Sequence, residues 1–175
     1  MLARLPWPSA VCGLAVFLAG CGPSQSGPPA GANNPQAGGQ IDPTGATTDE
    51  DSKWADHTQH LPFIIGYEKG LAEAKARNKP MMLFVTTTWC GWCKKLAEEN
   101  FNDSTVKKLL DNFVLVIVDG DTEPDALTKL GATEGFPHLI FQSNSGEKLG
   151  EHVGYLPLAD FKKVVEGALA KAGNA

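Results

Sequence analysis

Two cysteines, Cys90 and Cys93, lie where a short apolar segment gives way to an amphipathic one. Residues three positions apart share one face of the first helical turn, so the two sulfur atoms can form a disulfide or hold a metal ion. The unpaired N–H groups and the dipole at a helix start favour a thiolate at Cys90. A thiolate attacks disulfides, and Cys93 lies near enough to attack the mixed disulfide that Cys90 would form. The spacing therefore predicts a pair that cycles between dithiol and disulfide.

The elements that would position this pair follow from the hydrophobic pattern. The uninterrupted apolar segment 81–85 is typical of a strand covered on both faces, and it leads the chain toward the cysteines. Similar strands are expected at 113–118 and 138–142, and a turn at 144–146 should lead into an antiparallel strand at 148–153. Helices are expected at 63–78, after residue 93 with an interruption near 102–104, at 125–130 and from 157 onward. This alternation predicts an α/β fold with a mainly parallel sheet.

Residues 1–20 have the pattern of a signal peptide, with a basic Arg4, an apolar run and small residues just before Cys21. The segment Leu18-Ala19-Gly20-Cys21 resembles the lipobox of bacterial lipoproteins, which implies that Cys21 is lipid-modified and becomes the first residue of the mature chain. An ordinary secretory signal with a coincidental cysteine is the alternative. Cys12 would leave with the signal, so Cys90 and Cys93 would be the only thiols of the folded part.

The predicted location is therefore the bacterial cell envelope, lipid-anchored and facing the periplasm or the exterior. Gly22 after the lipidated cysteine favours the outer membrane slightly over the inner one. Residues 21–52 are rich in Pro, Gly, Ser and Asn and predict a disordered tether, which leaves residues 53–175 as one domain. The net charge of −5 is not accompanied by a basic stripe, so a nucleic-acid partner is not expected.

A Cys-x-x-Cys motif after a buried strand, inside such a series of elements, resembles the thioredoxin superfamily over about residues 63–169. Trp89-Cys90-Gly91-Trp92-Cys93-Lys94 is similar to the family's active-site motif, and Gly135-Phe136-Pro137 is similar to its cis-proline loop. The resemblance implies a central mixed sheet of four to five strands flanked by helices on both faces. It also implies catalytic roles for Cys90 and Cys93. Substrate-binding roles are implied for Trp89, Gly91, Trp92, Phe136 and Pro137.

Three positions depart from typical thioredoxins. Trp92 replaces the proline that precedes the second cysteine, which leaves the redox potential open. Phe84 occupies the position of a buried aspartate that assists deprotonation of that cysteine, and Ile117 occupies the position of the accompanying lysine. Proton exchange at Cys93 would then use water, Glu98 or another group.

The stretch from Cys93 to Phe101 looks more like the C-terminal domain of membrane thiol:disulfide interchange reductases. This similarity favours a reductase or disulfide carrier over a strong oxidase, acting as a monomer with no cofactor beyond its own disulfide. Its partners would be thiols and disulfides of exported proteins and an unidentified redox protein. A Cu(I)-handling protein and a non-catalytic docking module are the alternatives. His138 is expected at the surface at the start of a strand, and His57 and His60 are expected to be solvated.

Overall fold

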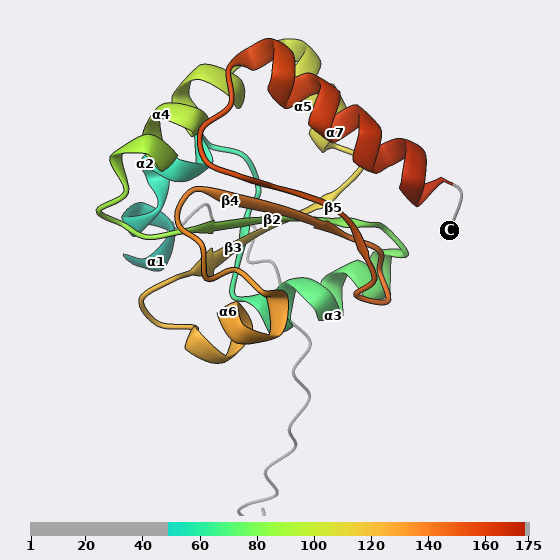
Figure 1. Cartoon of the computed structure of the whole chain (residues 1–175), viewed down its shortest axis with the longest axis horizontal. Coiled ribbons are helices and arrows are strands. Elements are labelled where there is room, and N and C mark those ends of the chain that lie inside the picture. The colour runs from blue at the N-terminus through green and yellow to red at the C-terminus, as the bar shows by residue number, and fades with distance from the viewer. Residues whose placement is uncertain (1–48, 174–175) are drawn as a thin grey trace, which may run out of the picture. The chain divides into compact units, whose positions relative to one another are not determined.

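The computed structural model describes residues 49–173. Its centre is a five-stranded sheet in the order β1-β3-β2-β4-β5 (Figure 1). The strands are β1 (Ile64–Ile65), β2 (Met81–Thr86), β3 (Val114–Asp119), β4 (His138–Gln142) and β5 (Lys148–Val153). The α/β prediction is confirmed, and the four strands expected from the sequence are present.

The strand β2 lies at the middle of the sheet and is buried along its whole length. It pairs with β3 in parallel, with Phe84 opposite Ile117, and with β4 in antiparallel fashion. The hairpin of β4 and β5 is antiparallel, as predicted. Because β2 is hydrogen-bonded on both sides, the chain that leaves its end is held in a fixed position.

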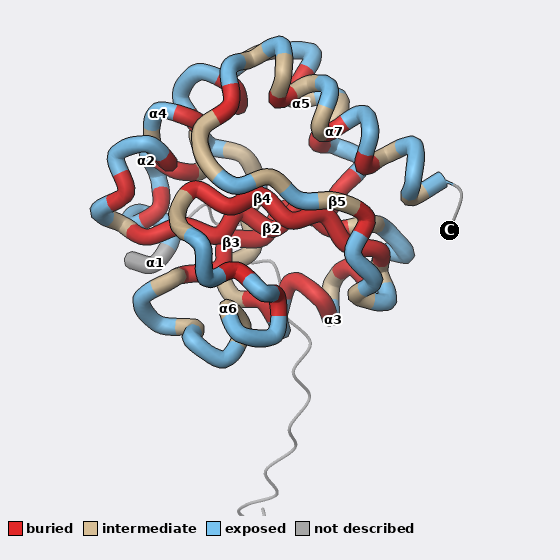
Figure 2. The backbone as a smooth tube through the Cα atoms, in the orientation of Figure 1, coloured by how far each residue is buried: buried red, intermediate tan, exposed pale blue. Residues whose placement is uncertain are grey.

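Helices cover both faces of the sheet (Figure 1). One face carries α4, α5 and α7, and the other carries α3 and α6. Their bounds are α3 (Tyr67–Arg77), α4 (Gly91–Asn100), α5 (Ser104–Leu110), α6 (Pro124–Leu130) and α7 (Leu158–Ala172). Buried residues follow the central strands and the sheet-facing side of each helix (Figure 2). The core is therefore split by the sheet into two apolar clusters.

The predicted interruption after the cysteines is a real helix boundary. Asp103 precedes α5 and its Oδ1 accepts hydrogen bonds from the N–H groups of Thr105 and Val106, at 2.9 and 3.0 Å. These bonds and the Lys162 ammonium group lower the pKa of Asp103. The cap lets the chain change direction between α4 and α5.

The N-terminal part of the domain differs from the prediction. The expected helix at 63–78 is shorter, because Ile64 and Ile65 pair with β3 as an edge strand and Gly66 turns the chain into α3. Two short helices precede them, α1 (Asp49–Lys53) and α2 (Ala55–Thr58). The first begins inside the range 21–52 that was predicted to be a tether.

The predicted signal peptide at 1–20, the lipidation site Cys21 and the rest of the tether lie outside the described residues. Among residues 49–173, no helix is long and apolar enough to cross a bilayer.

Candidate active site

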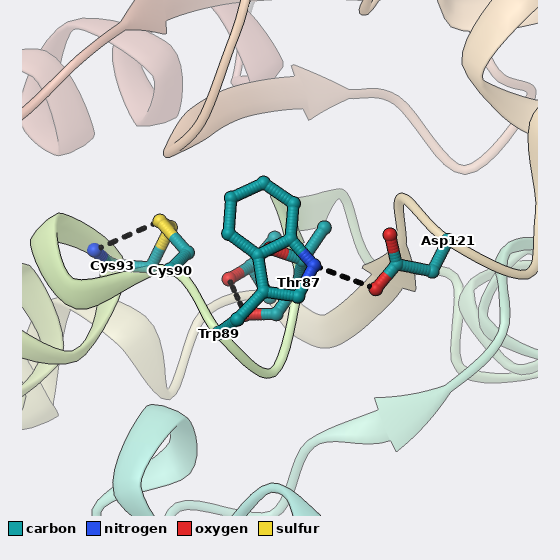
Figure 3. The surroundings of a disulfide bond; sticks show 6 residues. Thr87, Trp89, Cys90, Cys93 and Asp121 are labelled. Atoms are coloured by element: carbon teal, nitrogen blue, oxygen red, sulfur yellow. Dashed lines mark hydrogen bonds between the residues drawn. A yellow bond between two sulfur atoms is a disulfide. The ribbon is translucent and has the colours of Figure 1, made fainter.

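The two cysteines lie at the corner between β2 and α4. After β2 the chain turns at Thr87, whose carbonyl oxygen accepts the N–H of Cys90 at 3.1 Å. Cys90 is the N-cap of α4, and its Sγ accepts the N–H of Cys93 at 3.2 Å (Figure 3). The predicted helix start is thus built by a cysteine sulfur in the role that a serine or aspartate oxygen usually has.

Cys90 and Cys93 are joined in a disulfide, with their Cα atoms 5.3 Å apart (Figure 3). Cys90 keeps 6% of its surface exposed, whereas Cys93 is fully buried. A sulfur atom from outside can therefore approach Cys90 more readily than Cys93.

Trp89 and Trp92 are the large hydrophobic residues with the most exposed surface among those described, at 69% and 59%. Trp89 donates its indole N–H to Asp121 Oδ2 at 3.0 Å (Figure 3). Its ring meets Phe136 edge-on, with centroids 6.3 Å apart. Asp121 was not singled out in the sequence, because the bond joins residues from two different loops.

Trp92, which follows Cys90 in the sequence, belongs to a second aromatic cluster. Its ring lies 5.6 Å from that of Tyr155, and the Lys95 ammonium group lies 5.2 Å from both ring centroids. The Tyr155 hydroxyl donates to the Glu99 carboxylate, which raises the pKa of Tyr155. Trp92 thus packs against Lys95 of its own helix, α4, and against Tyr155 in the segment before α7.

The bond between Phe136 and Pro137 is cis, as the resemblance predicted. The Pro137 carbonyl accepts the N–H of Gly154 at 2.7 Å, which ties the loop to the end of β5. The Phe136 ring packs over Gly120, where an added Cβ would lie 2.4 Å from Phe136 Cζ. In contrast, a Cβ on Gly91 would meet nothing within 4 Å, so the described part of the chain imposes no steric need for glycine there.

Of the three positions predicted to depart from typical thioredoxins, Trp92 is exposed and the other two are apolar and buried. Phe84 and Ile117 are both fully buried on the face of the sheet that carries α4. The Glu98 side chain, which was considered for proton exchange at Cys93, lies on the exposed side of α4.

The prediction that His57 is solvated is wrong. The side chain is 1% exposed, because Trp54 and His57 share the inner side of the short helix α2. Its ring lies 5.2 Å from that of Trp54 and 6.3 Å from that of Phe84. Burial lowers the pKa of His57 below its ordinary value of 6.5, and the nearby Lys94 ammonium group lowers it further.

The prediction that His138 has its ring at the surface is also wrong. His138 is 1% exposed, and its Nε2 lies 3.2 Å from Glu151 Oε2 on the neighbouring strand. Bonds from Lys148 and then from His138 lower the pKa of Glu151. His60 is exposed, as expected. Within residues 49–173 no three His, Cys, Asp or Glu side chains gather as a metal site.

Comparison with known proteins supports this geometry. Residues 63–143 match a family model described as Thioredoxin-like. A thiol:disulfide interchange protein, DsbD of Campylobacter jejuni, is 32% identical over 113 residues, which cover 63% of this chain and 20% of that relative. The match therefore spans a fifth of the relative's length.

Two solved structures have the same fold as this chain. A thioredoxin from Thermus thermophilus is 26% identical, with a TM-score of 0.57, and the match covers 65% of this chain and 92% of the other. A protein described as DsbH oxidoreductase is 25% identical, with a TM-score of 0.51, and covers 63% and 85% of the two chains.

Proposed function

We propose that this chain is a thioredoxin-like thiol:disulfide oxidoreductase whose active pair is Cys90 and Cys93, because residues 63–143 match the Thioredoxin-like family model. One observation carries this proposal. The pair is joined at the start of α4, where Cys90 keeps 6% of its surface exposed and Cys93 none. This asymmetry gives the two cysteines different tasks.

In the reducing direction, the Cys90 thiolate attacks one sulfur of a substrate disulfide. A bond forms between Cys90 and that sulfur, and the second substrate sulfur leaves as a thiolate. Cys93 then attacks Cys90, and the bond to the first substrate sulfur breaks. The cysteine pair loses two electrons and the substrate gains them, and the oxidising direction is the reverse.

The position of Cys90 favours the attacking role. As the N-cap of α4 it receives the N–H of Cys93 at 3.2 Å, and this donor would stabilise a thiolate after reduction. Trp89, Trp92, Phe136 and Pro137 supply the surface on which an extended substrate segment would lie. The exposed indole rings suit such docking because they offer flat apolar area at low entropic cost.

Reduction of insulin with dithiothreitol as electron donor tests this function. Cys90→Ser should abolish catalysis, because no attacking thiolate remains. Cys93→Ser should trap a mixed disulfide with the substrate, which mass spectrometry detects. Undiminished activity in Cys90→Ser would refute the proposal.

The direction of electron flow and the attachment to the envelope belong to the same proposal. The similarity to DsbD supports a reductase or carrier, and a potential for the pair near about −270 mV rather than about −120 mV would agree with that direction. The Leu18-Ala19-Gly20-Cys21 sequence supports a lipid anchor. Cys21→Ser should abolish incorporation of labelled palmitate in cells and release the protein from membranes.

A further inference from the structure

We propose that His57 is the group that exchanges a proton with the Cys93 thiol at the corner between β2 and α4, called the redox corner below. This inference rests on the proposed oxidoreductase function. It assigns a role to a segment that lies outside the matched range 63–143, namely the short helix α2 that packs against α4 (Figure 1).

The chemistry requires such a group. Cys93 must lose its proton before it attacks the mixed disulfide, because the thiolate is the nucleophile. Cys93 is fully buried, and the neighbouring positions Phe84 and Ile117 offer only apolar side chains. Burial in such surroundings raises the pKa of a thiol and slows its deprotonation. A buried base close to the corner removes this obstacle.

His57 is a buried titratable side chain without an assigned partner at this corner. Among the described residues, neither its Nδ1 nor its Nε2 has a hydrogen-bond partner. An unsatisfied polar group in the core costs free energy, so its presence calls for an explanation such as a catalytic role. The Thr87 backbone lies close enough to raise the pKa of His57, although the contact falls short of hydrogen-bond geometry.

Two contacts tie the segment of His57 to the start of α4, where Cys93 lies. The residue before His57 is joined to the residue after Cys93, because Lys94 Nζ lies 3.2 Å from Asp56 Oδ2. In addition, the His57 ring packs against Phe84, which lies in the same apolar cluster as Cys93. The turn at Thr87 completes the corner, since its backbone faces His57 and its carbonyl oxygen receives the N–H of Cys90.

The charges around the ring favour a neutral imidazole that can act as a base. Burial and the Lys94 ammonium group lower the pKa of His57, and Asp56 opposes them less strongly. The neutral ring can therefore accept a proton at neutral pH and cannot hold it for long.

The step then balances as follows. The S–H bond of Cys93 breaks, a bond forms between the sulfur atoms of Cys93 and Cys90, and the substrate sulfur leaves Cys90 with the electron pair. The proton of Cys93 goes to the His57 imidazole and from there to water. When the disulfide is next reduced, His57 takes up a proton from water and passes it to the departing Cys93 thiolate.

The reaction of the reduced full-length protein with 5,5′-dithiobis(2-nitrobenzoate) tests this role, in a background in which Cys12→Ser and Cys21→Ser remove the two other thiols. The first thionitrobenzoate released reports attack by Cys90, and the second reports resolution by Cys93. His57→Phe keeps the size and aromatic contacts of the ring but removes its nitrogen atoms. It should leave the first phase unchanged and slow the second at least about tenfold at pH 7, below the usual range for a lost acid–base group because water remains as an alternative.

The exposed His60 provides the matched control, because His60→Gln should leave both phases unchanged. Wild-type resolution should also show a step in its pH profile below 6.5 that is absent in His57→Phe. A second phase in His57→Phe with the wild-type rate and pH profile overturns the role of His57. If the wild-type protein releases no second thionitrobenzoate, the oxidoreductase proposal itself fails.

A measurement on the wild-type protein covers the case in which His57→Phe does not fold. Titration of the histidine resonances by NMR in the oxidised and reduced states should give two different pKa values for His57, because the proton of the Cys93 thiol is present in only one of them. Identical values for His57 would overturn the assignment.

Discussion

Trp89 donates its indole N–H to Asp121 across the gap between two loops, with 3.0 Å between Nε1 and Oδ2. Asp121 is itself held in place, because its own N–H donates to Asp119 Oδ1 at 3.0 Å. The other oxygen of the buried Asp119 accepts from Lys53 of α1, also at 3.0 Å. A chain of polar contacts therefore runs from the first described helix to the tryptophan beside the disulfide.

We expect Asp121→Ala to free the Trp89 ring and to lower the rate of insulin reduction by about fivefold, which corresponds to the loss of one hydrogen bond worth about 1 kcal/mol. Asp121→Asn retains an acceptor oxygen and should keep most of the activity. Insulin turnover and tryptophan fluorescence anisotropy check both variants. Equal rates for Asp121→Ala and the wild-type protein would show that the bond does not position Trp89 for catalysis.

Trp92 should matter for protein substrates and not for small ones. Trp92→Ala removes an exposed ring that packs on Tyr155 and Lys95, and we expect KM for insulin to rise about tenfold, as for an interface residue worth 1 to 2 kcal/mol. The first phase with 5,5′-dithiobis(2-nitrobenzoate) should not change, because that reagent needs no docking surface.

The conservative variant Trp92→Phe separates docking from an effect on the cysteines. It keeps an aromatic face in the same position and should recover most of the affinity for insulin. A potential of the Cys90–Cys93 pair that shifts strongly in Trp92→Ala would indicate instead that the ring acts on the disulfide.

The redox corner was predictable from the sequence because its signals are local. The apolar run before the cysteines marks β2, and the three-residue spacing of Cys90 and Cys93 marks the first turn of a helix. The loop around Pro137 was accessible only through a resemblance, since nothing in its composition requires a cis bond.

The two histidines were mispredicted because their burial depends on distant residues. His57 is covered by Trp54 and Phe84. Trp54 precedes the four-residue helix α2, and Phe84 belongs to the central strand β2. A helix this short shows no 3.6-residue period, so its buried side cannot be inferred. The edge strand β1 was missed for a similar reason, since two residues cannot display strand alternation.

Gly120→Ala tests whether the cis-proline loop must be held against the corner. The new Cβ would lie 2.4 Å from Phe136 Cζ and 3.0 Å from Thr87 Cγ2, so the Phe136 ring would have to move away from Trp89. We expect a loss of about 1 to 3 kcal/mol in the free energy of unfolding, as for an overpacked core. Insulin reduction should fall as well.

Gly167→Ala is the control for this change. A Cβ there meets nothing within 4 Å, and the position lies in the exposed part of α7. This variant should gain up to about 1 kcal/mol from the better helix propensity of alanine and keep full activity. If Gly120→Ala matches the control in stability and activity, the close packing of Phe136 is not needed.

His57 should also make the stability of the folded domain depend on pH. Its pKa in the folded protein lies below the ordinary value of 6.5, chiefly because of burial, so the unfolded chain binds a proton more readily. Above pH 6.5 the imidazole is neutral in both states and adds little to the pH dependence of stability. As the pH falls from 6.5 toward the folded pKa, the unfolded state is favoured and the free energy of unfolding decreases.

Chemical denaturation between pH 7.5 and about 5 measures this loss above the range in which carboxylates titrate. His57→Phe should flatten the curve in this window. The same slope in His57→Phe and wild type would mean that His57 titrates normally in the folded protein.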